Sequence, residues 1–327
     1  MKKNIFLFLI CMQSVIYSQI DYSSSWEDFY SYNNVKDFIK VDDVIYALAD
    51  NAVFTYNETT QELEKFSSIQ GLSGETTSAI YYSNTYKRLV VGYENGLVEI
   101  IDDNGTITIS SDIASFNQTG IKRINHISEY NNILYLSTPF AIVEYDIEKL
   151  EFGDTFFIGN NSTSLLINET VIVDDIIYAA TEDGIFRAEV NSNLLIDFNS
   201  WQQDFPRRNF TRITDFNGAV FTTESSRLYE LSSTNLNQVF DFSETIININ
   251  ASATHLAVSL NNEAVILDTS LNQIQQFTAN TTFNFSLSDA LFIENKVYLA
   301  TKEFGILSTS ANQINTFEEI HPAGPLS

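Results

Sequence analysis

Short apolar runs rich in β-branched and aromatic residues recur along the chain in pairs, and a polar turn separates the two members of each pair. The first pair is residues 45–48 and 53–56, and the second is residues 89–92 and 97–100. Runs of this length bounded by turn residues predict β-strands. No apolar stripe with helical spacing is sustained over about 12 residues, so the pattern predicts an all-β chain.

The paired run occurs seven times, with an average spacing of about 42 residues. This period is typical of β-propeller blades, whereas leucine-rich repeats recur every 20–29 residues or so. The first runs of the seven pairs are residues 45–48, 89–92, 134–137, 177–180, 220–223, 256–259 and 297–300. The second runs are residues 53–56, 97–100, 142–145, 185–188, 228–231, 264–267 and 306–308.

Each pair has a further strand-like segment on either side. An apolar segment such as 78–82 or 171–173 precedes the pair, and a more polar segment ending in an aromatic residue, such as 238–242 or 273–277, follows it. The middle strands are apolar enough to be covered on both faces, and the last strand alternates like an exposed edge. We therefore predict a seven-bladed β-propeller of four-stranded antiparallel blades.

The turns agree with this assignment. Asn-Gly at 95–96 and Asp-Gly at 183–184 separate the two middle runs, where a tight hairpin favours residues that tolerate positive φ. Before the first middle run, pairs of Asp or Asn fill the turn at 42–43, 131–132 and 174–175.

A closed ring of blades has to be latched, and two segments are candidates. Residues 26–32 have the pattern of an outer strand, and we expect them to dock beside residues 305–308 of the last blade. The alternative latch is residues 313–317, in which case Trp26 packs only on the rim.

The N-terminus has the pattern of an export signal. Lys2 and Lys3 precede an apolar run, and Ser18 is a small residue suited to cleavage. A membrane anchor is disfavoured because the run is too short to span about 30 Å of hydrocarbon. Lipid attachment at Cys11 is disfavoured because the preceding residues are not small.

We accordingly expect three segments. These are a signal peptide at 1–18, the propeller at 19–320, and the start of a linker or second propeller at 321–327. The protein is expected to be exported to the periplasm or outer cell surface of a Gram-negative bacterium. No other apolar stretch approaches the ~20 residues of a transmembrane helix.

The net charge and the cysteine content exclude several classes of function. The formal net charge of −25 repels phosphates, so we expect no nucleic-acid partner. Cys11 is the one cysteine, and its removal with the signal leaves no disulfide, thiolate metal site or cysteine nucleophile.

Motifs for catalysis, cofactors and metals are missing from the sequence. The three histidines, His126, His255 and His321, have no metal-ligand spacing, and no Gly-x-Ser-x-Gly or glycine-rich phosphate loop occurs. Residues 102–105 resemble part of a calcium loop, but we interpret them as a hairpin turn. We expect no catalytic residue, no cofactor and no metal site.

One loop, residues 201–209, is a candidate binding surface because it carries Trp201, Arg207 and Arg208 in a strongly acidic chain. These side chains could contact a sugar, a carboxylate or a partner loop. The alternative is a rim turn whose arginines pair with neighbouring acidic residues.

Three segments, 71–74 (Gly-Leu-Ser-Gly), 78–82 and 89–96, resemble the N-terminal propeller of the PorZ family, a surface component of the type IX secretion system of Bacteroidota. Residues 26–32 and 321–325 are similar to that family as well. Its members are longer, with two propellers and a small C-terminal domain. They take part in the complex that attaches secreted cargo to an anionic lipopolysaccharide. The resemblance implies a non-catalytic propeller whose partners are other proteins of that complex, or a surface glycan or lipopolysaccharide.

Two other functions stay open. The same Gly-Leu segment and its following strands resemble the propellers of hybrid two-component regulators, which would make this a ligand-sensing domain. A propeller enzyme, such as a lyase or glycosidase, would need clustered carboxylates or histidines at the axial opening. The ends of the inner strands show no obvious acid pair, so we expect a protein that is not an enzyme.

Overall fold

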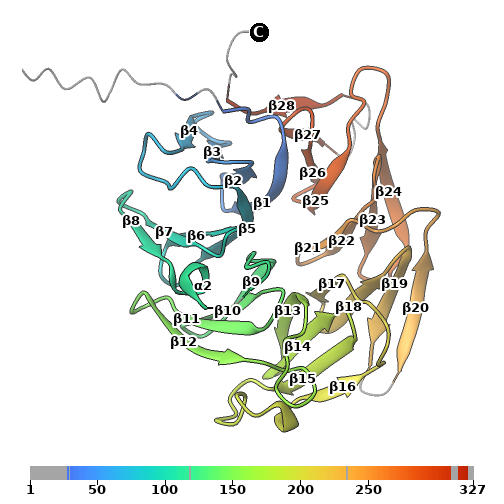
Figure 1. Ribbon diagram of the computed structural model, residues 1–327. Coiled ribbons are helices and arrows are strands. Elements are labelled where there is room, and N and C mark those ends of the chain that lie inside the picture. Colours follow the sequence, from blue (N-terminus) through green and yellow to red (C-terminus); the bar gives the residue numbers. More distant parts are fainter. Residues whose placement is uncertain (1–27, 29, 118, 233–234, 311–315, 323–327) are drawn as a thin grey trace, which may run out of the picture.

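Seven four-stranded antiparallel sheets stand around a common axis, which confirms the predicted seven-bladed β-propeller (Figure 1). The structure is a computed structural model that describes residues 28, 30–117, 119–232, 235–310 and 316–322 of the 327-residue chain. The predicted signal peptide at 1–18, with Cys11, lies outside the described residues, as do Trp26 and residues 323–325. No helix in the described part of the chain has the length and apolar character needed to cross a bilayer.

The chain builds each blade from four consecutive strands, running from the axis outwards. Blades 1 to 3 comprise β1 (Val35–Val41), β2 (Val44–Ala49), β3 (Val53–Asn57), β4 (Leu63–Phe66); β5 (Thr77–Ser83), β6 (Arg88–Tyr93), β7 (Val98–Asp102), β8 (Ile107–Ser110); and β9 (His126–Tyr130), β10 (Ile133–Ser137), β11 (Ile142–Asp146), β12 (Glu151–Phe156). Blades 4 and 5 comprise β13 (Ile167–Val173), β14 (Ile176–Thr181), β15 (Gly184–Glu189), β16 (Gln202–Asp204); and β17 (Arg212–Phe216), β18 (Ala219–Glu224), β19 (Arg227–Leu231), β20 (Leu236–Asp241). Blades 6 and 7 comprise β21 (Asn248–Ala251), β22 (His255–Ser259), β23 (Glu263–Asp268), β24 (Gln273–Thr278); and β25 (Leu287–Ile293), β26 (Lys296–Thr301), β27 (Ile306–Ser310), β28 (Glu318–Ile320).

The hairpins between the first and second strands use the predicted turn residues. Asp42, Asn131 and Asp174 all have positive φ, of 49°, 57° and 49° respectively. Tight hairpins require this left-handed backbone, which Asp and Asn tolerate better than most residues do. The predicted turn at 102–105 also forms, because the Gly105 N–H donates to the Asp102 carbonyl over 2.9 Å.

The hydrophobic core is divided among the blade interfaces. The described residues form seven buried clusters, and each cluster joins residues from two neighbouring blades. The middle strands are therefore covered on both faces, as their continuous apolar runs predict. The hydrophobic contacts that stabilise the fold are thus spread over the blade interfaces, so the last interface, between blades 7 and 1, has to be packed as well as the others.

The ring of blades does not close by the first of the two predicted latches. All four strands of blade 7 come from the C-terminal part of the chain, and β28 pairs with β27 as the outermost strand. The prediction that residues 26–32 add a strand beside 305–308 is wrong for its described residues, which form no strand. The alternative latch at 313–317 lies just before the observed strand, and its residues 313–315 are outside the described part.

Where the ring closes, side-chain packing holds blades 1 and 7 together instead of a shared strand. Tyr32 is fully buried in the cluster shared by blades 1 and 7, and its ring meets Phe54 edge-on at 5.9 Å. The Gly305 N–H donates to the Asn33 carbonyl over 2.8 Å, which ties the incoming segment to blade 7.

A charged cluster seals the same interface. Glu58, just after β3, accepts hydrogen bonds from Lys296 Nζ and from the Tyr298 hydroxyl of β26, each at 2.7 Å. Lys40 Nζ of β1 lies 3.4 Å from the other Glu58 oxygen, and its side chain is only 3% exposed. Burial acts to raise the pKa of Glu58, but the bonds from Lys296 and Tyr298 prevail and hold that pKa below its usual value.

Candidate functional site

Seven residues occupy equivalent register positions at the beginning of the seven inner strands. Asp37 of β1 pairs with Leu48, and Glu169 of β13 pairs with Ala180, at matching points of their second strands. We call these seven residues the axial ring: Asp37, Ala79, His126, Glu169, Arg212, Asn248 and Asp289. Figure 1 shows the inner strands around the centre of the molecule.

Local backbone irregularity helps to aim these side chains. The ladder register shifts by one residue at the start of β1, β5, β13 and β25, immediately before Asp37, Ala79, Glu169 and Asp289. Such bulges leave one residue unpaired and turn the strand locally, which redirects the side chains beside them.

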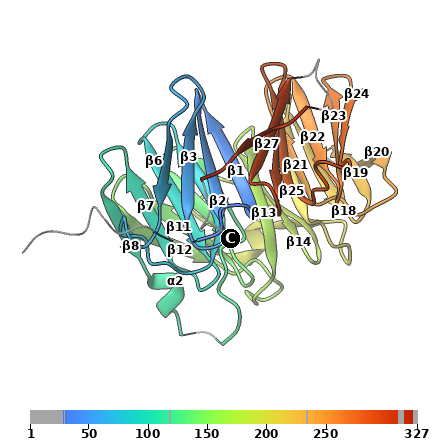
Figure 2. The ribbon, with the colours of Figure 1, turned by 90° about the horizontal axis from the view of Figure 1, so that it is seen from above.

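A cavity of about 370 Å³ lies over the axial ring. Six ring residues line it, and Ser288 takes the place of Asp289, which is fully buried behind it. The rim is charged and includes Lys36, Glu94, Arg123 and Lys302. Because the inner strands begin here, the cavity opens on the face that carries the connections from the outer strand of one blade to the inner strand of the next. Figure 2 shows one of these connections, which contains α2 (Asp112–Ser115), projecting from this face.

Two carboxyls of the axial ring influence one another. Asp289 accepts a hydrogen bond on each oxygen, from Asn248 Nδ2 at 2.7 Å and Asn250 Nδ2 at 2.8 Å, and its burial raises its pKa to about 7. Asp37 accepts the Phe38 N–H at 2.7 Å. Its enclosure, and then the charge of Asp289, raise the pKa of Asp37 well above the usual range.

The third carboxyl already has a cationic partner. Glu169 lies 3.3 Å from Arg212 Nη1 and accepts the Ile213 N–H over 2.8 Å. Arg212 Nε donates to the Ile247 carbonyl over 2.8 Å, so this guanidinium is held in place. Burial raises the pKa of Glu169, and Arg212 opposes that rise only in part.

His126 contributes the one imidazole of the axial ring. Its Nδ1 atom is buried and has no hydrogen-bond partner among the described residues. Burial, followed by the charge of Arg212, lowers the pKa of His126 to about 4. The imidazole is therefore neutral at pH 7.

The raised carboxyl pKa values predict a pH effect that Asp37→Asn should remove. Protons bound by the folded state stabilise it fully below the unfolded-state pKa of about 4, and this stabilisation is lost as the pH rises through the folded value. For Asp289 the folded value is about 7. We therefore expect the melting temperature of Asp37→Asn, relative to the parent, to rise between pH 5 and pH 8. The exposed control Asp103→Asn should give a constant difference over that range, and a constant difference for Asp37→Asn as well would contradict the prediction.

The axial ring was not predicted from the sequence. The expectation that the inner-strand ends hold no acid pair was wrong, because Asp37 and Asp289 lie at two such ends and influence each other's ionisation. Aligning the seven strand beginnings would have brought these residues together. The alternation of side chains between the two faces of a strand does not predict their positions there, because each bulge shifts that alternation by one residue.

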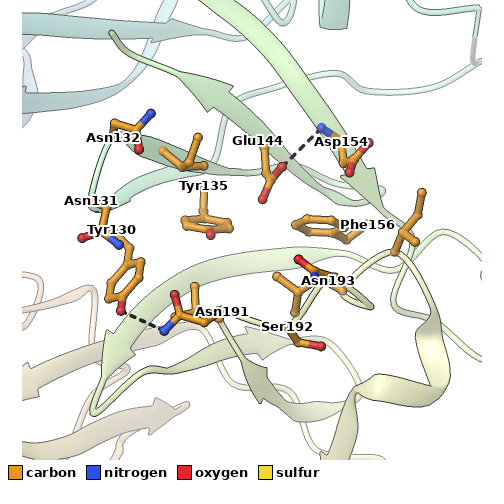
Figure 3. Close-up of a pocket in the computed structure, with 14 residues that line it drawn as sticks. Tyr130, Asn131, Asn132, Tyr135, Glu144, Asp154, Phe156, Asn191, Ser192 and Asn193 are labelled. Atoms are coloured by element: carbon orange, nitrogen blue, oxygen red, sulfur yellow. Dashed lines mark hydrogen bonds between the residues drawn. The ribbon is translucent and has the colours of Figure 1, made fainter.

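A second hollow of about 340 Å³ lies between blade 3 and the loop that follows β15 (Figure 3). Asn191 Nδ2 donates to the Tyr130 hydroxyl over 3.1 Å, and the Asp154 N–H donates to a Glu144 carboxylate oxygen over 3.4 Å. Tyr135 lies between these two pairs in Figure 3, but it is only 3% exposed. The hollow thus uses several of its polar groups within the protein and presents little open aromatic surface.

The predicted surface at Trp201, Arg207 and Arg208 is divided by the structure. Trp201 is only 6% exposed, packs in the interface of blades 3 and 4, and donates from Nε1 to the Leu195 carbonyl over 2.9 Å. The following residues, Gln202–Asp204, form strand β16 instead of a loop. Arg207 is exposed and has a left-handed backbone with φ of 66°.

Arg208 takes part in a local ion pair. Its Nε donates to Glu224 at 2.9 Å, and its Nη2 donates to the other oxygen at 2.5 Å. The guanidinium also stacks over the rings of Phe210 and Tyr229, at 5.1 and 4.9 Å from their centroids. The three predicted residues therefore do not converge on one site, and their role in binding stays a prediction.

Comparisons with known proteins agree with the architecture. Residues 45–202 match the family described as the N-terminal β-propeller domain of the type IX secretion protein PorZ. The structure of PorZ from Porphyromonas gingivalis, described as an essential bacterial surface component of that system, superposes with a TM-score of 0.77 at 19% identity, over 92% of this chain and 40% of that chain. The chain thus spans about two fifths of the length of that PorZ.

Two further structures share the fold. The extracellular domain of a putative hybrid two-component system from B. thetaiotaomicron gives a TM-score of 0.67 at 14% identity, over 84% of this chain and 40% of that one. A streptogramin B lyase gives 0.65 at 12% identity, over 84% and 94%. No curated protein sequence matches the chain.

The molecule is a seven-bladed β-propeller with a polar cavity at one end of its axis. Within it, residues 45–202 match the model of the PorZ N-terminal β-propeller domain, and the superposition on PorZ shows that the two share this fold.

Proposed function

We propose that this chain is a non-catalytic interaction module of a type IX secretion system, and that it holds another protein of the cell-surface attachment complex. The observation that carries the proposal is the match of residues 45–202 to the PorZ propeller family. The axial face supports it, because the outer-to-inner connections and the charged cavity rim lie there together.

The proposal includes export. Residues 1–18 would be removed as a signal peptide, and the mature chain would act in the periplasm or at the outer surface. Residues 321–327 would begin a linker or a second propeller. A surface glycan or lipopolysaccharide is a possible further partner, and the arginine-bearing surface at Arg207 is a second place for contact.

Affinity purification from the bacterium that encodes this chain tests the proposal. The tagged full gene product should co-purify from envelope fractions with other type IX attachment proteins, and Arg207→Glu should weaken that association if the predicted surface takes part. Asp103→Asn, an exposed change on a turn, is the matched control and should retain every partner. Recovery of a monomer free of all these proteins would count against the proposal.

A ligand-sensing propeller is the second candidate, and the axial cavity favours it, since about 370 Å³ suits a small molecule. The reading frame beyond Ser327 distinguishes the two. A second propeller there would favour the secretion module, and a transmembrane helix followed by a kinase would favour the sensor.

A further inference from the structure

We propose that a groove between blades 1 and 2 binds an arginine side chain of a partner protein, through the rings of Tyr46 and Tyr82 and the carboxylate of Glu64. The groove shares no lining residue with the axial cavity, and the inference does not depend on the proposed secretion function. It names the kind of partner residue that this surface fits, which neither the family match nor the superpositions address.

Two cross-strand rows of side chains form the walls of the groove. On blade 1, Tyr46, Thr55 and Glu64 stand opposite one another on three neighbouring strands, so their side chains share one face of the sheet. The facing row on blade 2 is Tyr82, Leu89 and Ile101. Both rows line a cavity of about 500 Å³, a volume within the range of ligand pockets.

The rings of Tyr46 and Tyr82 lie against each other where the two rows meet. Their centroids are 5.1 Å apart and their planes differ by 30°, so the rings stack. Both residues are half-buried and line the cavity, so part of each stays open to it. Burial raises the pKa of Tyr46 to about 12, and the neighbouring Tyr82 and the charge of Glu64 add to this rise. Neutral tyrosine rings attract cations, and guanidinium groups lie over such rings more often than ammonium groups do.

The lining of the groove is acidic. Its charged groups are four carboxylates and one ammonium, from Glu62, Glu64, Asp102, Asp103 and Lys87. Asp102 is bound by Arg88 Nε at 2.7 Å, and no other member of this set has an ion pair within the described residues. The net charge of −25 also attracts cations towards the surface. In the described part of the chain, no three His, Cys, Asp or Glu side chains are grouped so that they could hold a metal, which favours an organic cation.

Thr55 is the second, independent observation. This residue is only 8% exposed and lies between Tyr46 and Glu64 in the row on blade 1. Its hydroxyl has no hydrogen-bond partner among the described residues, and it is not one of the unbonded polar atoms that the protein encloses completely. The hydroxyl is therefore open to the groove that Thr55 lines. A nearly buried hydroxyl without a partner indicates a polar occupant, and as an acceptor it fits the N–H groups of a guanidinium.

The chain already uses this combination of groups elsewhere. Arg208 lies over the rings of Phe210 and Tyr229, and its guanidinium also binds both oxygens of Glu224. Three more cations each lie over a tyrosine ring and pair with a carboxylate: Lys65, Arg88 and Lys296. The groove presents two tyrosine rings and a glutamate without such a cation among the described residues, so the cation is left for another molecule to supply.

The apolar part of the groove favours arginine on a polypeptide. Val44, Phe66 and Leu89 line the same cavity as the rings and the carboxylates. The three methylene groups of an arginine side chain pack on apolar surface of this kind while the charged end reaches the carboxylates. The groove opens between two blades at the surface, where a side chain that projects from another protein can enter.

Isothermal titration calorimetry of the purified chain tests the inference, with a Gly-Ser peptide that has blocked ends and one central arginine. We expect a dissociation constant of about 1 mM or tighter. The same peptide with citrulline, the neutral isostere of arginine, should bind at least tenfold more weakly. Agmatine should bind no more tightly than the arginine peptide. Tenfold tighter binding of agmatine would assign the groove to a free amine and overturn the choice of a protein partner.

Four variants locate the binding in the groove. Glu64→Gln keeps the size of the side chain but removes its charge, and should weaken binding at least tenfold. Glu151→Gln is the matched control, an exposed glutamate on the outer strand β12 of another blade, and should leave binding unchanged. Thr55→Val removes only the hydroxyl and should weaken binding by about threefold. Lys87→Gln removes the one lining ammonium and should tighten binding by about threefold.

Three further results would overturn the inference. They are the absence of binding to the arginine peptide at about 10 mM, equal affinity for the arginine and citrulline peptides, and unchanged affinity in both Glu64→Gln and Lys87→Gln. The gain of affinity expected for Lys87→Gln keeps the test decisive, because a variant that fails to fold cannot produce it.

Discussion

Replacing Tyr32 with alanine is expected to lower the free energy of unfolding by about 3–5 kcal/mol, the cost of deleting a large aromatic side chain from a core. Tyr32 is fully buried between blades 1 and 7, where no strand from the N-terminal part completes blade 7 among the described residues. For a chain of this size the melting temperature should fall by roughly 5–8 °C. Thermal and denaturant unfolding of the purified chain measure both quantities.

Two further variants test whether the stability lost in Tyr32→Ala comes from the closure of the ring. Tyr32→Phe removes only the hydroxyl that donates to Asp28 at 2.9 Å, and should cost about 1 kcal/mol. Phe216→Ala deletes a residue that is just as buried, between blades 5 and 6. Hydrogen exchange should rise first in blades 1 and 7 for Tyr32→Ala and first in blades 5 and 6 for Phe216→Ala. The same exchange pattern in both variants would show that closure has no special dependence on Tyr32.

Glu58→Gln is expected to destabilise the protein by about 2–3 kcal/mol, because hydrogen bonds to a charged group are lost and a buried cation loses the nearer of its two carboxylate partners. Lys40, at 3% exposure, is that cation, and Lys296 and Tyr298 lose their charged acceptor. Urea unfolding of parent and variant at pH 7 gives the difference directly. The exposed pair of Arg227 and Asp241 provides a control, and Asp241→Asn should leave the urea midpoint unchanged.

The destabilisation caused by Glu58→Gln should also depend on pH, and its direction follows from the pKa of Glu58. The pKa of Glu58 is lower in the folded protein than in the unfolded chain, so its stabilisation is present above about pH 4.5 and is lost as the pH falls through the folded value. The stability difference between the parent and Glu58→Gln should therefore shrink in acid. A difference that stays constant from pH 7 to pH 3 would show that the charge of Glu58 does not seal the ring.

The two charged clusters of the molecule respond to pH in opposite directions. Ionisation of Glu58 stabilises the closure, whereas ionisation of Asp37 and Asp289 costs stability at the axial ring. The difference follows from their partners, since Glu58 contacts two lysines, whereas the two aspartates accept hydrogen bonds from side-chain amides and backbone N–H groups.

The loop with Trp201, Arg207 and Arg208 shows the limit of reading surface chemistry from residue type. An aromatic residue and two arginines in one segment suggested a shared binding surface. Trp201 instead fills the interface of blades 3 and 4, and Arg208 is bound by Glu224, a residue of the next blade. Neighbours along the chain were separated because the segment crosses from one blade to the next, so its side chains face different partners.

The number of blades, the order of their strands and the turns between them could be predicted from the amino-acid sequence alone. Those features depend on contacts between residues close along the chain, such as the Asn131 hairpin, and local pattern and backbone preference are enough to predict them. The closure of the ring and the residues around its axis became visible only in the folded structure. Glu58 and Tyr298 are 240 residues apart, and the axial ring takes one residue from every blade. Such contacts come from the curvature of the ring and from single-residue bulges, and neither leaves a periodic signal in the sequence.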